Sequence, residues 1–285
     1  MTTPGNPPAV PPAPPRDAAT VLLLRDGADA ASGALEVYLV KRSRQVDFMA
    51  GAHVFPGGRL DEADSSASAC ALLTADLPTL RAALGEDVVA PHAAGLFVAA
   101  IRETFEEAGL LLGSLAPGWT LPEARKAVAS GARFATLVGQ LDAAALVPWV
   151  RWVTPVISPK RFDARFFLAR APRGQVPEVD GREAVEGLWI TPGEALARWA
   201  RGGMQLAPAT AKSLDALSVF DTADAAMAAA RGRVPPVAMP VVWNENGRAY
   251  ISLPGDPRHP EKDAIGGRIL RVQLEGGRYR SVPAT

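Results

Sequence analysis

The stretch Arg102-Glu103-Thr104-Phe105-Glu106-Glu107-Ala108-Gly109-Leu110 is the part of the chain from which fold and site are best inferred. Its three glutamates stand at positions i, i+3 and i+4, so a helix places them on one face. Apolar residues recur on the opposite face and predict a side that packs in a core. Like charges at this spacing repel, so we expect a cation opposite them, and Mg2+ prefers such oxygen ligands. Taken alone, the pattern is also typical of a solvated acidic face.

Length and composition limit the classes of protein to which the chain can belong. It has 285 residues, of which 48% are hydrophobic and 21% charged, and this predicts a globular protein with a sizeable core. A formal net charge of zero gives no electrostatic reason to expect nucleic acid or an anionic membrane as a partner. The single Cys70 excludes an internal disulfide framework and a cysteine-based zinc site. No apolar run has membrane-spanning length and no signal peptide is evident, so we expect a cytoplasmic protein.

Changes in composition along the chain predict three regions. Residues 1–17 contain seven prolines and predict a disordered tail, residues 18–230 mix strand and helix patterns, and residues 231–285 predict a β extension. Strands and helices do not alternate regularly, so the fold class expected is α+β. The expected elements are strands at 19–24, 35–40, 164–169 and 268–274, helices at 91–108, 122–130 and 133–141, and a hairpin of 238–242 with 249–253 around Asn246-Gly247.

An earlier segment is needed to interpret the acidic stretch. It is Gly57-Gly58-Arg59-Leu60-Asp61-Glu62-Ala63-Asp64. Together the two segments resemble the Nudix box, G-x5-E-x7-R-E-U-x-E-E-x-G-U, the signature of the Nudix hydrolases. Asp64 stands where the signature has Glu, and Thr104 stands where it has a bulky aliphatic residue. The larger departure is the 37 residues of 65–101 in place of seven, an insertion of 30.

One branch of that family, the acyl-coenzyme A diphosphatase-like proteins, carries a long insert at this point. The resemblance covers roughly residues 18–220 and implies a Nudix fold, an α/β/α sandwich around a mixed sheet. It also implies a helical insert at about 65–94, with extra helices and a hairpin toward the C-terminus. Besides the box, the matching stretches are Gly51–Asp61, Lys160–Leu168, Trp189–Ala195 and Leu206–Pro208.

The resemblance assigns roles to the residues of the box. It implies that Glu103, Glu106 and Glu107 bind Mg2+ or Mn2+, and that the Gly57 carbonyl completes the metal site. Such ions polarise a pyrophosphate and activate a water molecule. For Arg102 the resemblance implies ion pairing that orients the catalytic carboxylates.

Residues outside the box supply further candidates. Glu183 and Glu186 are the candidates for a general base on a later loop, and a box glutamate is the alternative. Arg42 and Arg44 are expected near substrate phosphates, with solvated surface as the equal alternative. Arg161 and Phe162 are candidates for binding a phosphate and stacking on an adenine, or they form a structural turn.

Three functions remain open at the level of sequence. The favoured one is metal-dependent hydrolysis of the diphosphate bond of coenzyme A or acyl-coenzyme A, which yields 3',5'-ADP and a 4'-phosphopantetheine species. A second keeps this chemistry with another small nucleoside diphosphate-type substrate, ADP-ribose or NADH. A third is a non-catalytic Nudix sensor that binds a nucleotide, which the presence of all three glutamates and Arg102 disfavours. The sequence leaves the oligomeric state open.

Overall fold

A mixed eight-stranded sheet organises the computed structural model, which describes residues 13–27, 34–45 and 49–284. The central strand β1 (Arg16–Asp26) pairs in parallel with β8 (Phe162–Arg170) and antiparallel with β2 (Leu35–Arg42). The predicted α+β class and mixed sheet are therefore confirmed. The other strands of this sheet are β3 (His53–Val54), β4 (Gly57–Arg59), β7 (Leu146–Val153), β9 (Ala184–Ile190) and β10 (Val237–Ala238).

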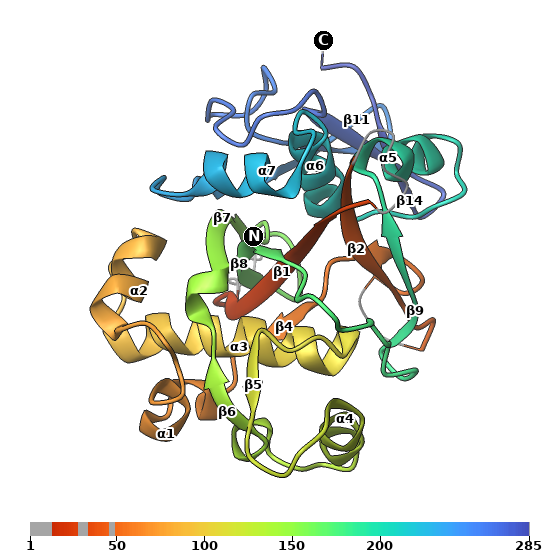
Figure 1. Ribbon diagram of the computed structural model, residues 1–285. Helices are drawn as coiled ribbons and strands as arrows, with labels where there is room; N and C mark the ends of the chain where they lie inside the picture. The colour runs from red at the N-terminus through yellow and green to blue at the C-terminus, as the bar shows by residue number, and fades with distance from the viewer. Residues whose placement is uncertain (1–12, 28–33, 46–48, 285) are drawn as a thin grey trace, which may run out of the picture.

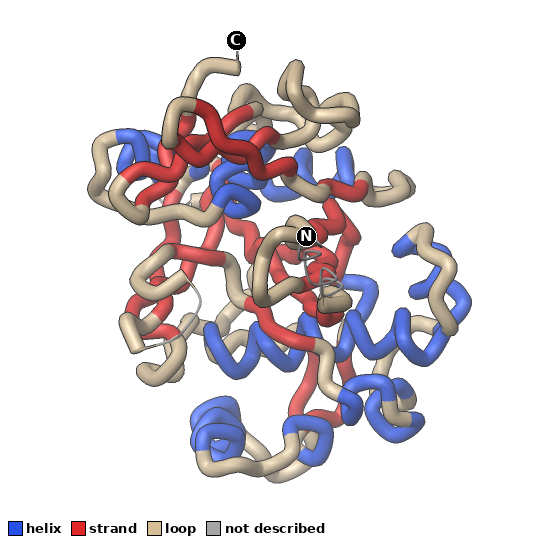
Figure 2. Tube along the Cα trace, turned by 180° about the vertical axis from the view of Figure 1, so that it is seen from behind, coloured by secondary structure: helices blue, strands red, loops and turns tan. Residues whose placement is uncertain are grey.

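Helices cover both faces of the sheet and make the predicted α/β/α sandwich (Figures 1 and 2). Side chains alternate along β1, so Val21 and Leu23 belong to one core and Leu22 and Leu24 to the other. We call these two sides the acidic-helix face and the C-terminal face. The first is covered by α1 (Ala67–Cys70), α2 (Leu77–Leu84), α3 (Ala90–Ala108) and α4 (Leu121–Ala129), the second by α5 (Pro192–Ala200), α6 (Pro208–Leu217) and α7 (Ala223–Ala230).

The predicted acidic helix is α3, which lies across the sheet. It ends at Gly109, whose φ of 65° is the left-handed conformation that glycine adopts readily. Its apolar side packs on the sheet, where the rings of Phe97 and Phe167 lie 4.9 Å apart. Thr104 is fully buried and donates a 2.7 Å hydrogen bond to the Ala100 carbonyl, which satisfies its hydroxyl where the signature has an aliphatic residue.

The insert is helical, as expected. Further along the chain, the helix predicted for 133–141 is wrong. After a short turn of helix at Phe134–Thr136, residues Val138–Leu141 form β6, which pairs with β5 (Gly113–Leu115). Gly139, in the middle of the predicted helix, disfavours helix, and the tertiary partner strand stabilises the extended backbone. A short 3-10 helix at Glu62–Ser65, which ends the first half of the box, leads into α1 and α2 of the insert.

The C-terminal region forms a second sheet of β11 (Val241–Glu245), β12 (Arg248–Ser252), β13 (Arg271–Glu275) and β14 (Arg278–Ser281). Its first hairpin turns at Asn246-Gly247 as predicted, with φ of 51° and 74°. The strand predicted for 238–242 is broken near Pro240, because Val237 and Ala238 pair instead with β7 of the main sheet. The final strand begins at Arg271 rather than 268.

The predicted tail is too long by at least two residues. Arg16 and Asp17 are part of β1, because they pair with Phe162 and Asp163 of β8. The rest of the predicted tail up to residue 12 lies outside the described residues. None of the helices formed by the described residues has the length and apolar character that crossing a bilayer requires.

Candidate active site

The two halves of the split box meet where β4 passes over α3. The Gly57 N–H donates a 3.0 Å hydrogen bond to a Glu107 carboxylate oxygen. A Cβ added at Gly58 would lie under 3.0 Å from the Glu103 carboxylate. Any side chain at 58 would therefore push the Glu103 carboxylate out of its present position. The three glutamates therefore do not form a solvated acidic face, because strand β4 covers two of them.

Arg102 joins the carboxylates of both halves. Its Nε and one Nη bind the two Asp64 oxygens at 2.9 Å each, in the fork geometry that strengthens such pairs. Its other Nη donates to Glu103 at 2.7 Å and to Glu106 at 3.2 Å. The Asp64 and Arg102 side chains are only 4% and 10% exposed. These contacts are the ion pairing that the resemblance implies for Arg102, with Asp64 as an additional buried partner.

Burial raises the pKa values of the three box glutamates. Desolvation raises the pKa of Glu103 to about 7, although the adjacent Arg102 opposes the shift. It raises the pKa of Glu107 to about 8, and the neighbouring Glu103 adds to the rise while the Gly57 N–H opposes it. Burial also raises the pKa of Glu106 above its ordinary value. The site therefore favours protons or a cation among its carboxylates.

The donor set fits a divalent metal ion, because Glu103 and Glu107 are buried carboxylates that lie close enough to repel each other. Within the described residues, however, no three acidic, histidine or cysteine side chains are already arranged around one ion. Glu106 instead turns to Arg102, and the contact seen at Gly57 is through its N–H rather than its carbonyl. The metal set of Gly57, Glu103, Glu106 and Glu107 stays a prediction.

Strand alternation separates the two candidates for a general base. Glu186 lies opposite Lys41 and binds its Nζ at 3.2 Å. Residues two apart in a strand point to the same face, so Lys41 lies on the face of Leu39 and Glu186 on the face of Leu188. Both leucines belong to the C-terminal face, and Glu186 therefore points away from α3. Glu183 precedes β9. Burial and the charge of Glu103 raise the pKa of Glu107, and the charge of Glu183 adds to this rise, whereas the Gly57 N–H and Arg42 oppose it. Glu183 is therefore the candidate on the side of the box.

The basic substrate-binding candidates divide in the same way. Arg42 lies next to Lys41 in β2 and so points to the acidic-helix face, where its charge lowers the Glu107 pKa in opposition to burial. Arg44 is exposed in the turn after β2. Arg161 donates to the carbonyls of Thr154 at 3.1 Å and Ala13 at 3.0 Å, which supports the structural-turn interpretation for it.

A second buried ionic cluster was not foreseen from the sequence. Glu86, from the insert, accepts hydrogen bonds from Arg165 of β8 at 2.6 and 3.0 Å and lies 3.0 Å from Arg151 of β7. Arg165 also binds Asp163 and Asp17. The side chains of Arg165 and Glu86 are 4% and 8% exposed. The cluster anchors the insert just before α3 begins, and no local pattern signals such a long-range pair.

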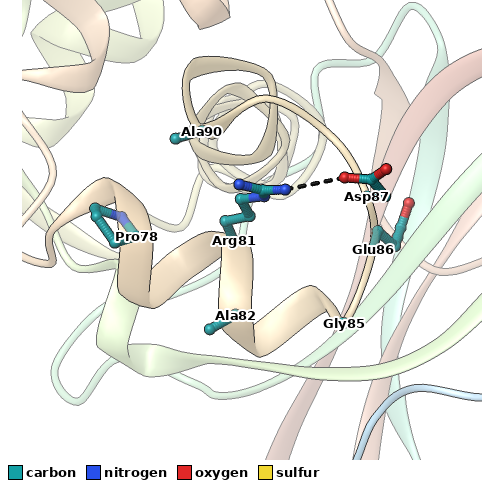
Figure 3. Close-up of a pocket in the computed structure, with 7 residues that line it drawn as sticks. All are labelled: Pro78, Arg81, Ala82, Gly85, Glu86, Asp87 and Ala90. Carbon is teal, nitrogen blue, oxygen red and sulfur yellow. Dashed lines mark hydrogen bonds and ion pairs between the residues drawn. The ribbon is translucent and has the colours of Figure 1, made fainter.

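The insert also carries a surface cavity of about 500 Å3 beside this cluster (Figure 3). Arg81 reaches across it to Asp87 with a 3.0 Å hydrogen bond. Its lining contains none of the box residues. The residues that line it are Pro78, Arg81, Ala82, Gly85, Glu86, Asp87 and Ala90.

Comparisons with known proteins agree with this geometry. A family model described as the NUDT19 Nudix domain matches residues 15–217. The acyl-coenzyme A diphosphatase NUDT19 of Gallus gallus is 32% identical over an alignment of 224 positions, and the match covers 61% of this chain and 58% of that protein. The protein of the same name from Homo sapiens is 32% identical over an alignment of 202 positions, and the match covers 55% of this chain and 53% of that protein. The chain thus spans little more than half the length of these two relatives.

A solved structure supports the fold. The crystal structure of a Nudix hydrolase from Alicyclobacillus acidocaldarius superposes with a TM-score of 0.60 at 29% sequence identity. The alignment covers 75% of this chain and 96% of that one. Together with the family match over residues 15–217 and the joined halves of the box, these similarities show that the chain belongs to the Nudix hydrolases, in the family described by the NUDT19 Nudix domain.

Proposed function

We propose that this enzyme hydrolyses the diphosphate bond of coenzyme A or acyl-coenzyme A with the help of Mg2+ or Mn2+. The observation that carries the proposal is the pair of buried glutamates, Glu103 and Glu107, held against β4 with the Asp64–Arg102 pair beside them. The substrate class is taken from the names of the relatives that are 32% identical. The products are 3',5'-ADP and a 4'-phosphopantetheine species.

The residues of the site divide the work of the reaction. Glu103 and Glu107 would hold the metal ion, which would polarise the diphosphate and lower the pKa of a water molecule. Arg102 keeps Glu103 and Glu106 oriented through its 2.7 and 3.2 Å hydrogen bonds. Arg42, on the same face of the sheet, stabilises negative charge on the phosphate oxygens.

Glu183 takes the proton of the attacking water. The water oxygen forms a bond to one phosphorus, the bond from that phosphorus to the bridging oxygen breaks, and the other phosphate leaves as an anion. A general base of this kind typically contributes about 10²–10⁴-fold to the rate.

Incubation with coenzyme A, an acyl-coenzyme A, ADP-ribose and NADH, each with Mg2+ or Mn2+, tests the proposal when products are separated by chromatography. We expect 3',5'-ADP from coenzyme A or its acyl derivative at the highest kcat/KM. A higher kcat/KM for ADP-ribose or NADH would contradict the proposed substrate but not the proposed hydrolysis of a diphosphate bond. No turnover of any of the four compounds would contradict the proposal that the protein is a diphosphate hydrolase.

A variant pair tests the assigned residues. Glu107→Gln removes a metal ligand without changing size, and we expect kcat to fall by at least about 100-fold. Glu194→Gln, on the exposed surface of α5, is the matched control and should keep wild-type activity. Full activity of Glu107→Gln would remove Glu107 from the metal site.

A further inference from the structure

The loop of residues 171–183, between β8 and β9, is fastened to the end of the acidic helix. The Gln175 side chain pairs with both main-chain groups of Leu111, at 2.9 and 3.0 Å. The Glu178 N–H donates a 2.9 Å hydrogen bond to the Ala108 carbonyl. The loop ends at Glu183, whose carbonyl accepts from the Ser43 N–H at 2.8 Å. These bonds tie the loop both to α3 and to the segment that follows β2.

Arg125, on α4, binds both the end of α3 and the first half of this loop. Its Nε donates to the Gly109 carbonyl at 2.9 Å, and its Nη2 donates to the same carbonyl. Nη2 also reaches the Val176 carbonyl at 2.9 Å, and Nη1 pairs with Glu178 at 2.7 Å. The Arg125 side chain is only 19% exposed. One guanidinium therefore links α4, the last turn of α3 and the loop.

Arg125 places its positive charge at the C-terminus of helix α3. Carbonyls at the C-terminus of a helix have no partners within the helix and carry partial negative charge, so a cation there is stabilising. A Cβ at Gly109 would lie 2.5 Å from the Arg125 Nε, so glycine serves the contact as well as the turn. Glu107 stands two residues before Gly109, in the turn that Arg125 fixes.

We infer that Arg125 is a positioning residue, which acts through the 171–183 loop to hold Glu183 beside the last turn of α3. The carboxylate of Glu183 is exposed and, among the described residues, accepts no hydrogen bond, so its place is set by its main chain. The main chain is set in turn by Asp180, which accepts from the N–H groups of Glu183 and Ala184 at 3.0 and 2.8 Å. The role of Glu183 itself rests on the proposed function.

The kinetic test is a double-mutant cycle with Arg125→Met and Glu183→Gln, assayed on coenzyme A. A misplaced group typically lowers the rate by about 100-fold, so we expect Arg125→Met to lower kcat by that order with KM nearly unchanged. If Arg125 acts through Glu183, the double variant will be no slower than Glu183→Gln alone. If the fold losses in kcat of the two single variants multiply in the double variant, the inference is overturned, because Arg125 then acts independently of Glu183.

A second measurement does not depend on turnover. Hydrogen exchange of the metal-free protein should show faster exchange of the Glu178 and Leu111 amides in Arg125→Met. Arg198→Met is the matched control, because Arg198 pairs with Glu194 on the exposed surface of α5 and should leave exchange and kcat unchanged. Unaltered exchange in Arg125→Met would refute the positioning role even if no substrate were turned over, whereas absent turnover with altered exchange would refute only the proposed function.

Discussion

Replacing Asp64 by Asn removes one charge from the pair that joins the two halves of the box. Asn keeps the size of Asp but offers a single acceptor oxygen, so one of the two 2.9 Å bonds from Arg102 is lost and an amide NH2 group faces the guanidinium. Asp64 also accepts a 2.9 Å hydrogen bond from the Asp61 N–H, which is put at risk. The two side chains are 4% and 10% exposed, so solvent cannot replace the partner.

The size of the effect follows from this burial. Removing one partner of a buried ion pair typically destabilises a protein by about 3–5 kcal/mol. Arg102 retains Glu103, Glu106 and the Arg59 carbonyl as partners, so we expect the lower end, about 3 kcal/mol. For a protein of this size this corresponds to a fall in Tm of roughly 6–12 °C.

Thermal unfolding followed by circular dichroism measures this change, with urea unfolding as a second assay. Asp87→Asn is the matched control, because Asp87 also pairs with an arginine, at 3.0 Å, but its side chain is fully exposed. The control should change stability by less than about 0.5 kcal/mol. If Asp64→Asn and Asp87→Asn melt within a degree of each other, the buried pair does not stabilise the joined box.

Three further outcomes are expected. Glu103 and Glu107 have folded pKa values raised to about 7 and 8, so the metal-free protein loses stability as pH rises from the ordinary carboxyl range through these values. Mn2+ binds the ionised forms, and it should therefore raise Tm more at pH 8 than at pH 6; an equal or smaller rise at pH 8 would count against this metal site. Gly58→Ala places a Cβ under 3.0 Å from the Glu103 carboxylate and should lower kcat by at least about 10-fold while circular dichroism stays unchanged. Glu86→Ala removes the carboxylate that accepts two hydrogen bonds from the buried Arg165 and should destabilise the protein by about 3 kcal/mol in urea, and a loss below 1 kcal/mol would show that the insert is anchored elsewhere.

Local patterns determined much of the fold in advance. The apolar period predicted the helix α3, while Pro91 and Gly109 predicted its two ends, the start to within one residue, because proline favours the first turn of a helix and glycine its end. The Asn246-Gly247 turn was equally clear, since its positive φ angles need those residues. The helix expected at 133–141 failed, because pairing of β6 with β5 is a tertiary contact without a local signal.

The sequence by itself determined which chemical groups the site contains. Spacing put three glutamates on one helix face, and the resemblance joined them to Gly58 and Asp64 across 37 residues. Only the tertiary structure decided how these groups are placed. It buried Glu107 under β4, turned Glu106 to Arg102 and set Glu183, rather than Glu186, on the side of the box. The physical reason is that burial, pairing and sheet face are fixed by contacts between residues far apart in the chain, which no local pattern encodes.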